Sequence, residues 1–287
     1  MSNKDHTLIR AMELVRSNWL HATHILREAA DNDPDDPSYQ IAMGDIFASR
    51  SSFDKAIQHY LAALSLDPSN QQVIGMIANS YLSSGEYRLA LAYYQKLLHP
   101  GDDLLYNKAL SQAFLGKHED CIETLLQILP RFPSHPFIYY LLVEQYFYKG
   151  DSMTALKYIG IAKEKAGEHV QLYLLNALIY TNLNQYLQAY HQYLKADSMS
   201  PITNSDHLLG FAKSANECGM WQDALKIYER ITVRYPYISE AWGEIIKIYL
   251  DRDNYIQAKR YLNKAKSKLQ RPSSVIRLLQ KRLDGMS

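Results

Sequence analysis

Two pairs of side chains in this 287-residue sequence have types that could do chemistry. His21 and His24 lie three residues apart, which places two imidazoles on one face of a helix. Such a pair can share a metal ion, but two histidines alone make an incomplete site. Cys121 and Cys218 lie in no catalytic motif with a base. We therefore expect no catalytic residue, no metal site and no cofactor, and we interpret both cysteines as structural.

The glycines do not form a phosphate-binding loop. There are 12 of them, and most fall at expected helix ends or close-packing positions. No cluster of acid, base and nucleophile is visible along the chain. The sequence therefore favours a binding protein over an enzyme.

Composition limits the fold and the compartment. The chain has 31 basic and 30 acidic side chains, and its 12 glycines and 10 prolines are too few for a turn-rich β-sandwich. Two cysteines exclude a disulfide framework and favour a reducing compartment. Neither a secretory signal nor an apolar run of membrane-spanning length is present, so we expect a cytoplasmic protein.

A small residue recurs along the chain at steps of 34 or 35 residues, with one step of 31. In the segment Gly44–Pro68 it is preceded twelve residues earlier by another small residue. It is followed four residues later by a tyrosine and twelve residues later by a proline. The segments Ala177–Pro201 and Ala212–Pro236 repeat that grid. The recurring positions are Ala22, Ala56, Ala90, Cys121, Ala155, Ala189, Ala224 and Ala258.

This period predicts two helices of about a dozen residues in each repeat, joined by a tight turn. Five residues before the recurring small residue stands a type that tolerates the left-handed backbone with which many helices end. These turn residues are Gly85, Gly116, Gly150, Asn184, Gly219 and Asp253.

The grid resembles the tetratricopeptide repeat family over essentially the whole chain. That resemblance implies an all-α, right-handed superhelical solenoid of stacked helix-turn-helix repeats. We predict a single domain over 1–287 with a capping helix at 273–284. Its eight repeats span approximately 3–36, 37–70, 71–101, 102–135, 136–169, 170–203, 204–238 and 239–272.

The resemblance also implies that the first helix of each repeat lines a concave groove. The fifth repeat opens with the aromatic run PFIYYLLVEQYFYKG, in which several rings fall outside the packing grid. We predict a groove for a peptide or helix of another protein at the fourth to sixth repeats. The alternative is that these rings pack against one another. The predicted groove residues are Tyr106, Asn107, Phe137, Tyr140, Glu144, Phe147, Tyr148, Gln171, Leu174, Leu178 and Asn182.

One ligand class of the family can be excluded. The clamp that binds chaperone carboxyl termini needs lysines and an arginine as well as asparagines. Asn79 and Asn107 occupy suitable positions, but the neighbouring groove positions hold Gly75, Phe137 and Leu141. A terminal carboxylate gains little without positive charge.

Charge is unevenly distributed between the ends of the chain. Nine lysines or arginines and no acid fall between Ile256 and Arg282, whereas the first 70 residues carry ten acids and six bases. We expect an adaptor, scaffold or chaperone that binds protein and not nucleic acid. The alternatives are a scaffold that self-associates through its acidic and basic ends, and the regulatory subunit of an enzyme complex.

Overall fold

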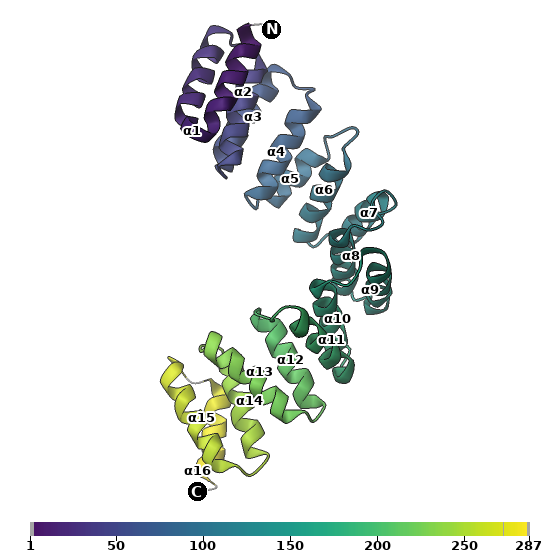
Figure 1. The fold of residues 1–287 in the computed structure, drawn as a ribbon, viewed down its shortest axis with the longest axis vertical. Coiled ribbons are helices and arrows are strands. Elements are labelled where there is room, and N and C mark those ends of the chain that lie inside the picture. Colours follow the sequence, from purple (N-terminus) through teal and green to yellow (C-terminus); the bar gives the residue numbers. More distant parts are fainter. Residues whose placement is uncertain (1–2, 272, 286–287) are drawn as a thin grey trace. The chain divides into compact units, whose positions relative to one another are not determined.

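The computed structural model describes residues 3–271 and 273–285, with side chains from His6 onward. Every regular element within those residues is an α-helix (Figure 1). The predicted all-α solenoid of helix-turn-helix repeats is therefore confirmed. Position 272, the predicted end of the eighth repeat, lies outside the described residues. No described helix is both long enough and apolar enough to cross a membrane.

The chain divides into two compact units between Lys149 and Gly150, in the turn after the eighth helix. In the first unit consecutive helices pack side by side (Figure 1). Its helices are α1 (Asn3–Asn32), α2 (Pro37–Ser49), α3 (Phe53–Leu66), α4 (Gln71–Ser83), α5 (Tyr87–Tyr94), α6 (Asp102–Phe114), α7 (His118–Ile128) and α8 (Pro136–Tyr148).

The second unit continues the same alternation of first and second helices. Its helices are α9 (Ser152–Ala166), α10 (Val170–Asn182), α11 (Tyr186–Met199), α12 (Ser205–Glu217), α13 (Trp221–Arg234), α14 (Ser239–Leu250), α15 (Tyr255–Lys268) and α16 (Ser274–Asp284). The expectation of one domain over the whole chain stays a prediction.

The turn residues adopt the backbone that the sequence predicts. All six have positive φ, from 54° at Asp253 to 90° at Gly150. Ser51 adds a seventh turn of this kind, with φ of 57°. Glycine reaches this region without steric cost, whereas serine, asparagine and aspartate reach it with a small penalty. Each turn ends one helix and reverses the chain within a few residues.

The first repeat is built differently. Its two helical segments are continuous in α1, apart from Asn18, whose φ of −151° and ψ of 75° are not helical. The Asn18 side chain accepts a hydrogen bond from the backbone N–H of His21 at 3.1 Å, as an N-cap does. A capping asparagine therefore starts the second segment here, in place of a left-handed turn.

Close contact between paired helices depends on the recurring small residue. All eight of these residues, from Ala22 to Ala258, are 0% exposed. Where a neighbouring helix has a glycine, a tyrosine ring can lie directly against its backbone. A Cβ atom added to Gly44 would come within 2.3 Å of the Tyr60 ring, and one added to Gly210 within 2.4 Å of the Tyr193 hydroxyl. The spacing of small residues thus sets the distance between the helices.

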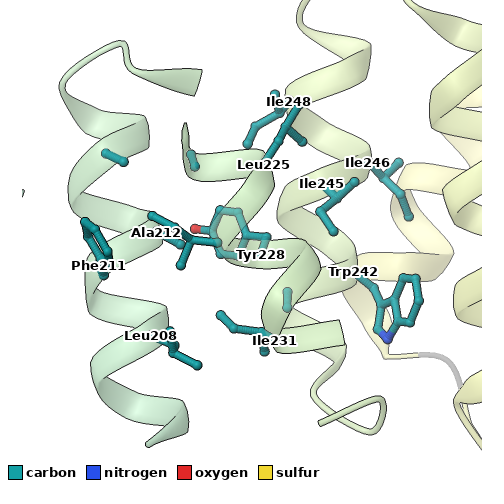
Figure 2. Packing of buried hydrophobic residues seen from close by; sticks show 14 of the residues in the cluster. Leu208, Phe211, Ala212, Leu225, Tyr228, Ile231, Trp242, Ile245, Ile246 and Ile248 are labelled. Carbon is teal, nitrogen blue, oxygen red and sulfur yellow. The ribbon is translucent and has the colours of Figure 1, made fainter. Parts of the chain in front are cut away.

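Large side chains fill the layers between successive hairpins. In the second unit Phe211 of α12, Tyr228 of α13 and Trp242 of α14 belong to one continuous core (Figure 2). No single hairpin could bury both of its apolar faces, so each layer depends on the next. The last hairpin is covered by α16, whose Ile276, Leu279 and Leu283 are buried.

The shorter step between the third and fourth repeats corresponds to a shorter second helix in the third repeat. Helix α5 has only eight residues, whereas the other second helices have between eleven and fifteen. Gly101 then precedes α6 with extended backbone. The helix pairing of α4 with α5 and of α5 with α6 is retained.

We expect Gly44→Ala to lower the free energy of unfolding by about 1–3 kcal/mol, because the new methyl group must displace the buried Tyr60 ring. Gly160→Ala is the matched control, since a Cβ at this exposed helical position meets nothing within 4 Å. It should stabilise the protein by about 0.5–1 kcal/mol. Urea unfolding followed by circular dichroism measures both, and equal midpoints for Gly44→Ala and wild type would contradict the packing argument.

Candidate functional site

The predicted groove residues of the first unit lie on two first helices that contact each other, α6 and α8. Phe137 and Tyr148 are 58% and 62% exposed, at the two ends of α8. Tyr106, Tyr140 and Phe147 are half-buried. One large ring therefore stands in solvent at each end of a row of partly covered ones.

These rings contact one another only in part. The Phe137 and Tyr140 rings meet edge to face, with centroids 5.6 Å apart. The Phe147 and Tyr148 rings have the same centroid separation and are tilted. Such pairs hold the rings in place without covering their outer faces, as the exposure of Phe137 and Tyr148 shows. Some of the ring packing of the alternative is therefore present, and the groove stays a prediction.

Asn107 has a structural bond that the sequence did not reveal. Its amide donates to Oδ1 of Asn79 at 3.0 Å, and the Tyr94 hydroxyl donates to the same oxygen at 2.6 Å. Tyr60 and Asp45 form the equivalent pair one repeat earlier, at 2.7 Å. The two tyrosine–acceptor pairs have a signal in the sequence, because each tyrosine follows its acceptor by 15 residues, but the bond of Asn107 has none. Asn107 is therefore held by α4, and it is only half-buried.

Glu144 is a half-buried carboxylate with no hydrogen bond or ion pair among the described side chains. Burial raises the pKa of Glu144 above its usual value. Glu144 lies close enough to Tyr106 and Cys121 to help raise the pKa of each, although burial is the larger cause for both. A charged group that lacks a partner at low exposure destabilises the fold, so Glu144 stays a candidate for contact with a ligand.

Cys121 is fully buried, and burial raises the pKa of its thiol to about 12. A thiol of this kind is not a nucleophile at neutral pH. His21 and His24 are both exposed, and His24 lies 3.8 Å from Glu28. No group of three metal-ligating side chains comes together within the described part of the chain.

The other four predicted groove residues lie in the second unit, on α10. Gln171, Leu174 and Leu178 are half-buried, and Asn182 is exposed. Leu174 packs against the core of that unit. Their membership of one site with α6 and α8 stays a prediction.

The structure adds a pocket that the sequence did not predict. A cavity of about 160 Å³ opens beside Tyr106, between the start of α6, the end of α7 and the start of α8. Phe132 and His135 line it from the loop between α7 and α8. The loop sequence LPRFPSHPF, with a proline at every third position, was the available signal. The helical repeat pattern does not extend to this loop, so it did not predict that Phe132 and His135 line a pocket.

Comparison with known proteins identifies the repeat. A tetratricopeptide repeat family model matches residues 14–71, and a second model of the same description matches residues 73–105. The chain carries tetratricopeptide repeats. A tetratricopeptide repeat-containing protein of Methanocaldococcus jannaschii is 28% identical over 157 residues, which are 53% of this chain. The matched region spans about a quarter, 27%, of that relative's length.

Solved structures share the tetratricopeptide repeat fold at low identity. A tetratricopeptide repeat protein from Parabacteroides merdae superposes with a TM-score of 0.62 at 19% identity, covering 86% of this chain and 98% of its own. The Cut9–Hcn1 hetero-tetramer of APC/C gives 0.57 at 15% identity, over 98% of this chain and 56% of that one. YrrB, described as having an unusual peptide-binding site, superposes with a TM-score of 0.55 at 19% identity, covering 64% of this chain and 95% of the YrrB chain. These likenesses concern the fold alone.

We expect Glu144→Gln to stabilise the protein at neutral pH by about 1 kcal/mol or less, because the folded state no longer holds an unpaired charge. The folded-state pKa of Glu144 is raised, so its penalty is present above that pKa and disappears as the pH falls below the unfolded value. Wild type and variant should therefore converge in acid. Thermal unfolding across that pH range measures the difference.

Glu123→Gln is the control for this prediction, since it makes the same substitution at an exposed position of α7. It should leave stability unchanged within a few tenths of a kcal/mol at every pH. An equal gain for both variants, or a loss for Glu144→Gln, would show that Glu144 is not a strained carboxylate.

Proposed function

We propose that the chain is a non-enzymatic protein-interaction module, acting as an adaptor, scaffold or chaperone. Its site is the first-helix face of the first unit, where α6 and α8 bind a peptide or helix of another protein. The observation that carries this proposal is the exposure of Phe137 and Tyr148 around a row of half-buried rings. Rings of this kind act as anchors because they bury a large area for few rotatable bonds.

The chemistry of the face supports a protein ligand. Its groups are aromatic rings and the amide of Asn107, with a carboxylate at Glu144. Such a mixture suits a peptide with apolar side chains spaced along one side. The described residues bring together no acid, base and nucleophile here, and the buried Cys121 thiol is unreactive. The peptide-binding site described for YrrB, which has the same fold, is in keeping with this use.

The experiment is a quantitative pull-down from native cell extract with the wild-type chain and with Phe137→Ala/Phe147→Ala. A partner of this face should be lost from the variant, because each anchor contributes about 1–3 kcal/mol. A peptide from the recovered partner should then bind wild type in calorimetry and bind the variant at least tenfold more weakly.

Leu89→Ala is the matched control, because Leu89 is a large apolar residue, 44% exposed, on the second helix α5. It should retain the partner. Thermal unfolding must also place Phe137→Ala/Phe147→Ala close to wild type. A large loss of stability would mean that the two rings belong to the core, and an unchanged set of partners would move the site elsewhere.

A second candidate function, self-association, is favoured by the charges of the two units. In the second unit, cavities of about 600 and 510 Å³ flank α13 and share Glu229 and Val233. The cations that line them are Lys226, Arg230, Arg234, Lys264 and Lys268. In the first unit, Asp31, Asp33 and Asp35 are exposed in the segment that ends α1 and leads to α2, and none is ion-paired among the described side chains.

Sedimentation velocity at low salt tests this candidate. Association should weaken as salt rises, because exposed charges are screened. Lys264→Glu/Lys268→Glu should abolish it, and adding Asp33→Lys/Asp35→Lys in the same chain should restore it. A wild-type chain that stays monomeric at every concentration and salt would remove the candidate.

A further inference from the structure

From the second repeat onward, the first helices of the first unit carry charge of mostly one sign. Helices α2, α4, α6 and α8 contain four carboxylates and a single cation, Lys108. The carboxylates are Asp45, Asp102, Asp103 and Glu144. The face that we propose to bind a peptide is therefore electronegative as well as aromatic.

The pocket beside Tyr106 concentrates both properties. His135 stands between three other rings, with centroids 6.3 Å from Tyr106, 6.5 Å from Phe132 and 5.8 Å from Phe137. All three rings are inclined steeply to it, by 52°, 81° and 56°. Asp102 and Asp103 complete the lining from the first turn of α6. Of these four rings, Tyr106, Phe132 and His135 line the pocket, and Phe137 contacts His135 without lining it.

The loop that carries Phe132 and His135 is held in place before any ligand arrives. The His135 N–H donates to the Phe132 carbonyl at 3.1 Å, and the Phe132 N–H donates to that of Leu129 at 3.1 Å. The hydroxyl of the buried Tyr139 donates to the Pro133 carbonyl at 2.8 Å. Three prolines in seven residues further restrict the backbone. Little conformational entropy remains to be lost when the pocket is filled.

Two of the nearby carboxylates are unmatched. Arg131 pairs with Asp102, and it lies over no ring within the described structure. Asp103 is exposed and Glu144 is half-buried, and neither forms an ion pair among the described side chains. The amino end of α6 supplies roughly half a positive charge, which offsets part of one carboxylate only. The region around Tyr106 therefore retains negative charge.

We propose that this pocket binds a cationic side chain, lysine or arginine, of the peptide held on the first-helix face. The inference rests on the proposed function and adds the chemistry of the partner. A volume of about 160 Å³ admits one side chain and is below the range of small-molecule sites. The aliphatic stem of that side chain would lie against Ile128 and Ile138, and its charged end against the rings and Asp103.

Other occupants fit less well. A carboxylate or phosphate would meet Asp102 and Asp103 with no unpaired cation lining the pocket. A purely apolar side chain would fill the volume but leave Asp103 of the lining without a counter-charge. A cation satisfies both the rings and the carboxylates, so charge complementarity selects it.

The test is an NMR titration of the isotopically labelled full-length chain with N-acetyl-arginine amide, using N-acetyl-citrulline amide as the neutral isostere. The arginine derivative should shift the backbone signals of Asp103, Tyr106 and His135 in a saturable way. It should bind about fivefold or more tightly than the citrulline derivative. Equal affinities, or shifts confined to other residues, would overturn the inference.

Two variants separate binding from folding. Phe132→Ala and Asp103→Asn should each weaken the arginine derivative by about threefold or more, with the remaining signals unmoved. Asp120→Asn, at an exposed carboxylate of α7 that pairs with Lys117, should have no effect. Weakening by Asp120→Asn to the same degree would show general charge attraction and refute the pocket.

The outcome is independent of the pull-down. Suppose that the Phe137→Ala/Phe147→Ala variant loses a partner, but that the partner's peptide binds equally well after its lysines and arginines are replaced by glutamine. That result would refute the cation pocket and leave the proposed function intact. Saturable arginine binding at the pocket without any partner of the face would contradict the proposed function alone.

Discussion

Everything in this chain depends on helices approaching closely enough to share one apolar layer. The constraint is carried by the eight small residues that are completely buried where the two helices of a repeat meet, from Ala22 to Ala258. A larger side chain there would separate the helices and open voids on both sides. Each hairpin then exposes an apolar face that only the next hairpin can cover, so stability is a property of neighbours and not of single repeats.

Two buried tyrosines combine a large ring in the packing layers with a hydrogen-bonded hydroxyl. Tyr60 and Tyr94 bury their rings between helices, yet each hydroxyl reaches a polar acceptor on a first helix, Asp45 and Asn79. A phenylalanine would fill the same volume and leave the acceptor without a donor, which is costly at low exposure. Nine of the 23 tyrosines are buried, whereas others, such as Tyr148, are exposed.

The sequence predicted the helices well because their determinants are local and periodic. A small residue every 34 positions and a turn residue five places earlier fix where each hairpin begins and reverses, and Gly85, Asn184 and Asp253 bear this out. The sequence could not predict that Asn107 would be tied to Asn79, or that His135 would stand among three rings. Both depend on the distance between neighbouring repeats, which a period along the chain does not specify.

The candidate site lies at positions whose side chains the packing layers do not require. On α8 the packing layers do not require particular side chains at the exposed and half-buried positions, in contrast to the buried Ile138, Tyr139, Leu141, Leu142, Val143 and Gln145. Nevertheless the exposed and half-buried positions hold Phe137, Tyr148 and Glu144, two exposed rings and a carboxylate that lacks a partner. Exposed rings reduce solubility and an unpaired half-buried charge reduces stability. The ligand that we propose would cover the rings and neutralise the charge, and so would offset both costs.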